Sequence, residues 1–193
     1  MSILERPAVM KVRQALLDAG LEDTVVELAE TARSAEDAAQ AVGCELGAIV
    51  KSLVFTIERR FVMALIAGDH QCAEDNLPGA FNLTGAVGRP QAAEVKGITG
   101  FTIGGVAPIG LSHALPIVID RSLKRFEKVF AAAGHPSCVF ATTPANLGRI
   151  TTGIISASIA VPDNPDETTV VGMKGSRTFS TGKESRINAV EGT

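Results

Sequence analysis

One lysine stands where packing alone does not explain it. Lys51 lies in the apolar stretch Ile49–Phe55, and strand alternation places it on the same face as Ile49, Leu53 and Phe55. An isolated ammonium is costly to bury in a dry core, so its head must reach a cleft or an anion. Such a point charge can hold an anionic ligand group such as phosphate. The alternative interpretation is an edge-strand lysine whose head reaches water.

Two adjacent glycines are the second feature that could take part in chemistry. Gly104 and Gly105 lie in the glycine-rich segment Gly97–Gly110, whose exit is stiffened by Pro108. Side-chain-free backbone approaches a ligand closely, and its N–H groups can hold a carbonyl oxygen or a developing oxyanion. The alternative is an ordinary turn between a helix and a strand. The glycine spacing matches neither a dinucleotide-binding fingerprint nor a P-loop.

A histidine in a turn is the third feature. His135 follows Gly134 after an apolar strand, and could act as an acid, a base or a hydrogen-bond donor near neutral pH. The alternative is a surface histidine. His70 follows a strand in a similar turn and His113 lies in a loop, so the three histidines give no metal-ligand spacing.

The remaining nucleophilic side chains give no recognisable motif. Cys44, Cys72 and Cys138 are widely spaced and form neither a zinc knuckle nor a redox pair. No Gly-x-Ser-x-Gly elbow is present. Covalent catalysis therefore has little support in the sequence, and we expect no metal and no cofactor.

Short helices interleaved with a larger number of strands must position these residues. Ser34 with Asp37 forms a capping-box pattern, and Thr143 before a proline marks another helix start. The predicted helices cover residues 7–19, 35–43, 91–99 and 144–150. The predicted strands cover residues 24–28, 49–57, 61–67, 116–120, 128–133, 139–141 and 154–161, the last closing the core. This pattern is typical of the α+β class, with a mixed, strongly curved sheet and helices packed outside it.

Composition limits the classes of partner. The chain has 193 residues, of which 46% are hydrophobic and 20% charged, with a net charge of −3, no Trp or Tyr, and 8 Phe. A broad basic surface for nucleic acid is not expected, while a local one stays open, and the apolar runs are too short to span a bilayer. We expect a cytoplasmic protein with reduced thiols. Polar residues dominate from Pro162, which predicts one domain over residues 1–161 and a polar C-terminal extension over residues 162–193.

Five segments together resemble a known family, and they occur in its order. They are residues 32–39, 49–55, 68–70, 99–110 and 133–136. The sequence resembles the YbaK-like family of prolyl-tRNA synthetase editing domains and their free-standing relatives. The resemblance runs from about the first helix to about Val161, and the segment after Pro162 matches nothing in the family.

The resemblance implies a fold and a reaction. The fold is a barrel-like mixed sheet flanked by helices, and the reaction is hydrolysis of the ester that joins a wrong amino acid to tRNA, usually tRNA for proline. Lys51 matches the family's signature lysine, near the terminal adenosine and its phosphate. Gly104 and Gly105 match the backbone loop that positions the aminoacyl carbonyl. His135 falls where some editing domains have a functional histidine.

The resemblance also implies a substrate pocket. Thr31 and Ala38 fall near positions that line the amino-acid pocket of relatives, and Asp69, Pro108 and Gly134 are further substrate-binding candidates in the matching motifs. An aminoacyl ester is already activated, so positioned water or the ribose 2′-hydroxyl can attack without a protein nucleophile. Discrimination by one methylene is worth only about 1–3 kcal/mol, which is why a separate editing site is useful.

The expected partners follow from that reaction. They are the acceptor end of an aminoacyl-tRNA and, as a second candidate, a prolyl-tRNA synthetase, with no membrane and no DNA, and with the protein a monomer or weak homodimer. Two alternatives stay open. One is a non-catalytic module of the same fold that binds aminoacyl-tRNA or another phosphate-bearing ligand. The other is a Schiff-base enzyme that uses Lys51.

Overall fold

The computed structural model describes residues 2–29, 32 and 34–163. Its helices are α1 (Pro7–Asp18), α2 (Ala35–Val42), α3 (Leu77–Ala80), α4 (Ala92–Thr99) and α5 (Pro144–Thr151), with 3-10 turns at Ile3–Glu5, Leu46–Ala48, Glu74–Asn76 and Arg121–Arg125. Its strands are β1 (Val25–Glu27), β2 (Ile49–Ile57), β3 (Arg60–Ala67), β4 (His70–Cys72), β5 (Val87–Gly88), β6 (Ile117–Asp120), β7 (Val129–Ala132), β8 (Cys138–Thr142), β9 (Ile154–Ser156) and β10 (Ala160–Pro162).

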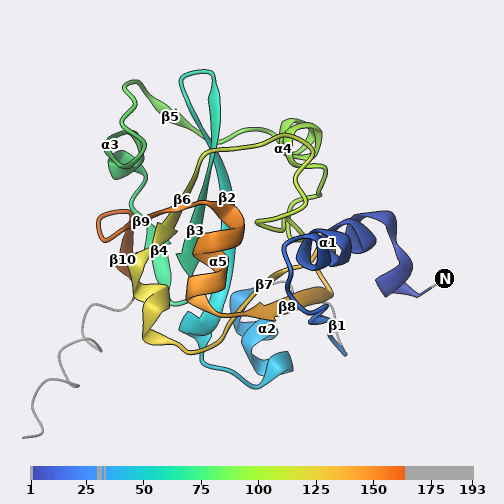
Figure 1. The fold of residues 1–193 in the computed structure, drawn as a ribbon. Coiled ribbons are helices and arrows are strands. Elements are labelled where there is room, and N and C mark those ends of the chain that lie inside the picture. The colour runs from blue at the N-terminus through green and yellow to red at the C-terminus, as the bar shows by residue number, and fades with distance from the viewer. Residues whose placement is uncertain (1, 30–31, 33, 164–193) are drawn as a thin grey trace, which may run out of the picture. The chain divides into compact units, whose positions relative to one another are not determined.

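The central feature is a mixed sheet built around the long β2–β3 hairpin (Figure 1). Seven of its strands run in the order β1-β8-β7-β2-β3-β6-β9, and β5 pairs with β2 beside this path. The hairpin is antiparallel. β7 pairs in parallel with β2, β6 pairs in parallel with β3, and β9 pairs in parallel with β6. The α+β class and the mixed sheet are therefore confirmed. A separate two-stranded sheet joins β4 to β10.

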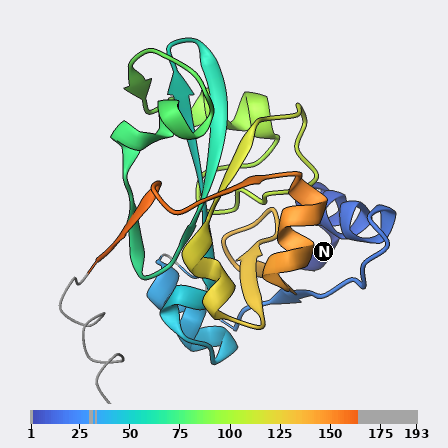
Figure 2. The same ribbon diagram turned by 60° about the vertical axis from the view of Figure 1, so that its left-hand side comes forward.

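Helices cover both faces of the sheet (Figure 2). One core cluster joins apolar residues of α1, α4 and α5 to one face of the sheet, and it includes Leu16, Val95, Phe140 and Leu147. A second cluster packs α3 and the β10 side of the chain on the opposite face. A smaller one packs α2 against Ile49 and its neighbours. The sheet is thus buried on both sides, as the uninterrupted apolar sequence of β3 predicts.

Local sequence signals fix where the helices begin and end. The Ser34 hydroxyl accepts from the Asp37 N–H, and the Asp37 carboxylate accepts from the Ser34 N–H, which is the predicted capping box. The helix ends at Gly43, which has the left-handed conformation that glycine adopts without steric cost. The Thr143 hydroxyl caps α5 by accepting from the Asn146 N–H at 3.1 Å.

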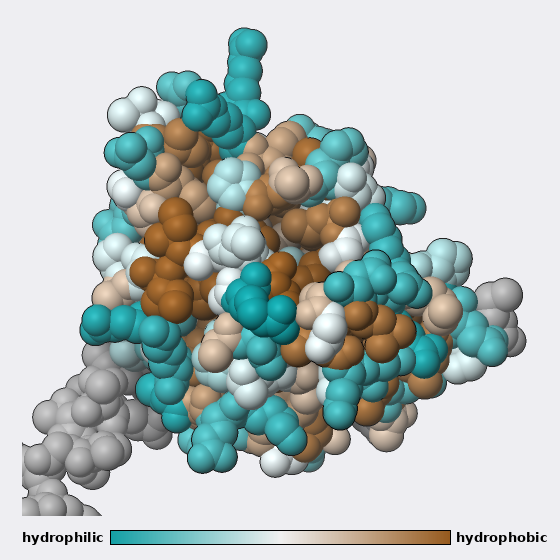
Figure 3. All heavy atoms as spheres, viewed as in Figure 1, coloured by the Kyte–Doolittle hydropathy of each residue, from teal (hydrophilic) through white to brown (hydrophobic). Residues whose placement is uncertain are grey.

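The predicted closing strand is wrong. Residues 154–161 form two short strands, β9 and β10, which belong to different sheets and are separated by a bend. Ile159 is buried, but Ile154, Ile155 and Val161 are 56%, 41% and 50% exposed. Figure 3 shows an apolar area of the surface on the side where β9 and β10 lie. The apolar run is therefore mostly sheet edge and not core.

The C-terminal boundary falls slightly later than expected. Pro162 pairs with His70 in the β10–β4 ladder, and the Asp163 N–H donates to the Asp69 carbonyl at 3.0 Å. The fold therefore includes two residues assigned to the polar extension, whose residues 164–193 lie outside the described part. Among the described residues, no helix is long and apolar enough to cross a membrane.

Candidate functional site

The sheet has a gap along one edge of β2. On this edge β7 pairs only with Ile49 and Val50, and β5 pairs only with Thr56 and Ile57. Between these two short ladders, the edge of residues 51–55 has no partner strand within the described ranges. The gap arises because β7 ends at Ala132 and β5 has only two residues.

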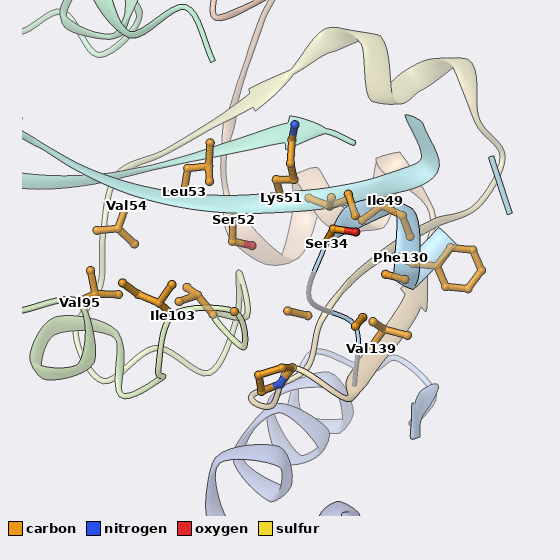
Figure 4. A pocket seen from close by; sticks show the side chains of 18 of the residues that line it. Ser34, Ile49, Lys51, Ser52, Leu53, Val54, Val95, Ile103, Phe130 and Val139 are labelled. Atoms are coloured by element: carbon orange, nitrogen blue, oxygen red, sulfur yellow. The ribbon is translucent and has the colours of Figure 1, made fainter. Parts of the chain in front are cut away.

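A cavity of about 570 Å³ lies at this gap, within the usual size range of small-molecule sites. It is lined by seven consecutive residues of β2, by α2, by the Ile103–Val106 loop, and by β7 and β8 (Figure 4). Most of the lining is aliphatic. The charged residues among those that line it are Lys51 and Arg89, both cationic. The site therefore combines an apolar interior with two cationic residues in its wall.

The structure brings the predicted glycine loop and histidine turn together. Gly104 lines the cavity, and its φ of +90° is one that only glycine adopts without strain. The Gly105 carbonyl accepts from the Gly134 N–H at 3.0 Å, and the Gly105 N–H donates to the Thr102 carbonyl. A Cβ on Gly105 would lie 2.8 Å from the backbone nitrogen of His135. Gly105 is thus packed against the turn, and Gly104 is the glycine that faces the cavity.

His135 sits beside the cavity and not in its lining, which includes the next residue, Pro136. The His135 Nδ1 accepts from the Ser137 N–H at 3.1 Å, so the neutral ring carries its proton on Nε2. Burial lowers the pKa of His135, nearby Arg6 lowers it further, and Glu27 opposes them. The ring is therefore neutral at pH 7.

Lys51 lines the same cavity as Gly104, but its ammonium lies on the other side of β2. Its side chain points away from the side on which Ser52 and Val54 project (Figure 4). The Lys51 Nζ donates to the Gly68 carbonyl at 3.2 Å and also to the His70 carbonyl. Backbone carbonyls thus satisfy two of its three donors, and the structure does not bring the ammonium to the glycine loop.

Asp69 belongs to this second group, outside the cavity. Its carboxylate accepts from Arg125 at 2.9 Å and lies 2.6 Å from the His70 Nδ1. Burial alone would raise the pKa of Asp69, but hydrogen bonds from His70 and Arg125 outweigh it and lower the pKa. Asp69 therefore stays ionised and orders the turn that holds the Lys51 ammonium.

The other predicted site residues lie at different distances from the cavity. Ala38 lines the cavity from α2. Pro108 is buried and does not line it. Gly134 contacts the site through the hydrogen bond that its N–H donates to the Gly105 carbonyl. It packs closely against helix α1, because a Cβ on Gly134 would lie 2.5 Å from the Ala8 carbonyl. Thr31 lies outside the described residues.

Sequence reasoning missed Ser52, which lines the cavity. Its hydroxyl oxygen is buried and has no hydrogen-bond partner among the described residues. Strand alternation places this serine with Val50 and Val54, so a hydroxyl on an otherwise apolar strand face was the available signal. Arg89 was also missed. Its guanidinium lies 5.5 Å from the centre of the Phe55 ring and pairs with Glu74 at the rim.

The lining supplies no obvious covalent or metal chemistry. Burial raises the pKa of Cys138 to about 11, aided by Glu27, so its thiol is protonated at neutral pH and is a poor nucleophile. Within residues 2–29, 32 and 34–163, no cluster of three His, Cys, Asp or Glu side chains could hold a metal ion. What the site offers is an apolar cavity, a glycine backbone, a neutral imidazole nearby and a cationic rim.

Sequence comparison relates the chain to known proteins. Residues 29–150 match a family described as the aminoacyl-tRNA editing domain. YwhH of Bacillus subtilis, an uncharacterized protein, is 35% identical over 129 residues, which are 66% of this chain and 81% of YwhH. The proline–tRNA ligase of Lactobacillus helveticus is 34% identical over 101 residues, which are 52% of this chain but only 17% of the ligase.

Solved structures show the same fold. One, described as a candidate trans-editing enzyme for prolyl-tRNA synthetase, is 36% identical with a TM-score of 0.72, over 78% of this chain and 95% of that one. Another, from work on epitope backbone grafting onto scaffold proteins, is 34% identical with a TM-score of 0.74, over 78% of this chain and 96% of that one.

Proposed function

Because the chain belongs to the aminoacyl-tRNA editing domain family, we propose that it hydrolyses the ester of mischarged aminoacyl-tRNA in the cytoplasm. We propose as substrate a tRNA for proline that carries a small wrong amino acid such as alanine, cysteine or serine. The observation that carries the proposal is the apolar cavity at the gap beside β2, which has Gly104 on its wall and the cation Arg89 at its rim.

The cavity supports this chemistry by its shape and charge. Its aliphatic lining favours a small acyl side chain, and the cation Arg89 at its rim favours the phosphate of a terminal nucleotide. The prolyl-tRNA synthetases among the relatives are consistent with tRNA for proline as the substrate, and such a synthetase is the second partner we propose.

The reaction needs no protein nucleophile. Water attacks the ester carbonyl, the carbonyl oxygen becomes an oxyanion, and the bond to the ribose oxygen then breaks. The ribose oxygen takes up a proton, which leaves a free amino acid and an uncharged tRNA. The substrate's own 2′-hydroxyl can orient the water and relay its proton, by giving its own proton to the leaving ribose oxygen as it accepts the one from water. Most of the acceleration then comes from positioning and from stabilising the oxyanion.

Three residues have proposed roles in this step. Backbone at Gly104 positions the carbonyl, since this glycine lines the cavity in a conformation that brings main chain close to a ligand. Neutral His135 donates through Nε2, the nitrogen that its bond with Ser137 leaves protonated. The Lys51 ammonium lies on the other side of β2, where two of its N–H groups hold the backbone turn before β4 and the third is left for a phosphate outside the cavity.

A panel of mischarged tRNAs tests the proposal. Purified protein is incubated with tRNA for proline charged with alanine, cysteine, serine or proline, and release of the amino acid is followed. We expect release of at least one small amino acid well above background and retention of proline. If every ester stays intact while the tRNA still binds, the protein is a binding module of the same fold. If neither occurs, the proposed function is wrong.

A further inference from the structure

The unpaired edge of β2 presents main-chain groups to the cavity. In an antiparallel pair, the N–H and C=O of a residue both point toward the partner strand or both point away from it. Met63 lies opposite Val54, but its N–H donates to the Pro116 carbonyl at 2.9 Å and not to β2. Val54 therefore points its own N–H and C=O away from β3, and so does Ser52, two residues earlier.

No strand in the described part of the chain takes up these groups. The parallel ladder with β7 stops at Val50, and the ladder with β5 starts at Thr56. The N–H and C=O groups of Ser52 and Val54 thus face the gap in which the cavity lies. Seven consecutive residues of β2 line the cavity, which fits this arrangement. A cavity against the face of a strand would contact only every second residue, whereas a cavity at the edge of a strand contacts every residue.

The Ser52 hydroxyl adds a side-chain group to this edge. It projects into the cavity from β2 (Figure 4). Its oxygen is buried, and among the described residues it is the one buried side-chain nitrogen or oxygen atom without a hydrogen-bond partner. Leaving such a group unpaired is unfavourable, so a ligand that supplies the partner is favoured over one that cannot.

We propose that Ser52 and the open edge of β2 bind the α-amino group of the acyl moiety. This inference rests on the proposed function, since it assigns part of the same cavity. The Ser52 hydroxyl and the Ser52 and Val54 carbonyls are acceptors, and an amine needs acceptors. Among the described residues, no carboxylate lines the cavity to take that role. The aminoacyl group then lies against β2 as one residue of an added strand would, with its side chain in the aliphatic part of the cavity.

A pair of stable analogues tests this assignment. The probes are adenosines whose 3′-oxygen is replaced by nitrogen, one carrying an alanyl amide and the other a propionyl amide that lacks only the α-amino group. We expect the wild-type protein to bind the alanyl probe about tenfold tighter or more. The Ser52→Ala variant should reduce this ratio about three- to tenfold by weakening the alanyl probe alone. Ser52→Thr, which keeps the hydroxyl, should retain most of it.

Controls separate this role from a structural one. Ser158→Ala removes an exposed hydroxyl outside the cavity and should leave both affinities unchanged. The melting temperature of Ser52→Ala should stay the same or rise, because the lost hydroxyl has no partner. If that variant does not fold, the wild-type ratio for the two probes decides the question by itself.

The outcomes also distinguish this inference from the proposed function. Equal wild-type affinity for the two probes, no binding of either, or an unchanged ratio in a folded Ser52→Ala variant overturns the inference. If mischarged tRNA is hydrolysed but the probes bind equally, the proposed function stands without it. If the probes are discriminated but no ester is cleaved, the amine site stands and the deacylase does not.

Discussion

At the scale of single residues, Lys51 joins β2 to the turn before β4. We expect Lys51→Met to lower the free energy of unfolding by about 1–3 kcal/mol, because the buried Gly68 and His70 carbonyls lose a charged donor. Urea unfolding measures the change. Exposed Lys124→Met is the control and should stay within about 0.5 kcal/mol of wild type.

The same variant tests the role of Lys51 toward the substrate. Deacylation that falls by far more than the loss of folded protein supports a contact with phosphate. Activity that follows the folded fraction alone would make Lys51 a purely structural residue. A variant as stable as wild type would contradict the carbonyl contacts and show that removing this desolvated charge costs no stability.

The pKa of His135 gives a pH dependence of stability. Burial, with Arg6, holds this pKa below the ordinary value of 6.5, so the folded protein binds the proton less readily than the unfolded chain does. The stability linked to His135 is therefore complete above pH 6.5 and decreases as the pH falls below it. Protonation also breaks the bond that Nδ1 accepts from Ser137.

We expect wild-type protein to lose more stability between pH 7.5 and 5.5 than His135→Gln does. Urea unfolding at the two pH values gives the difference. His113→Gln, which changes an exposed histidine, is the matched control and should follow the wild type. An identical loss in His135→Gln and wild type would show that this ring titrates as it does in the unfolded chain.

At the scale of elements, substituting two glycines by alanine should change the stability of the protein in opposite directions, one through packing and the other through chain flexibility. A Cβ on Gly105 would meet the His135 backbone at 2.8 and 2.9 Å, and backbone cannot easily move aside. We expect Gly105→Ala to destabilise the protein by about 1–3 kcal/mol and to impair the site. Gly97 lies inside α4 with nothing within 4 Å of an added Cβ. Gly97→Ala should stabilise by about 0.5–1 kcal/mol.

Thermal and urea unfolding of the two variants measure the contrast, and Gly148→Ala in α5 repeats the helical case. A Gly105→Ala protein as stable and active as wild type would mean that the glycine loop and the histidine turn separate freely. A destabilised Gly97→Ala would contradict the open space around α4.

Elements with strong local signals were predictable from the sequence. The capping box at Ser34, the proline at the start of α5 and the alternation in β2 each rest on interactions within a few residues, and they gave nearly correct boundaries. The run 154–161 failed because its apolar residues lie at sheet edges, and strand order, which sequence periodicity does not encode, decides where the edges are.

The candidate site shows the same division. Residue type pointed to Lys51 and Gly104, and both line the cavity. The importance of Ser52 could not be predicted, because it depends on a gap between β7 and β5 that only the assembled sheet creates. The direction of the Lys51 ammonium likewise depends on carbonyls in a turn seventeen and nineteen residues away.

At the scale of the whole molecule, charge predicts how tRNA binding responds to salt. The chain carries 18 Lys and Arg against 21 Asp and Glu, so it has no overall attraction for RNA. Among the described residues, the cations that line the cavity are Arg89, at the rim, and Lys51, whose ammonium lies on the other side of β2. Neutralising about two phosphates of a single strand gives a slope of about −1.4 for the logarithm of the binding constant against that of salt concentration.

Titrating a stable 3′-amide of alanyl-tRNA into the protein at several salt concentrations measures this slope. Arg89→Ala should make the slope shallower, at about −0.7, and weaken binding, because one phosphate contact is lost. Exposed Arg59→Ala, in the β2–β3 turn and outside the cavity lining, should leave it unchanged. A slope steeper than about −4 in the wild type would require a wider basic contact, and the cavity rim would then not be the main binding surface for the acceptor end.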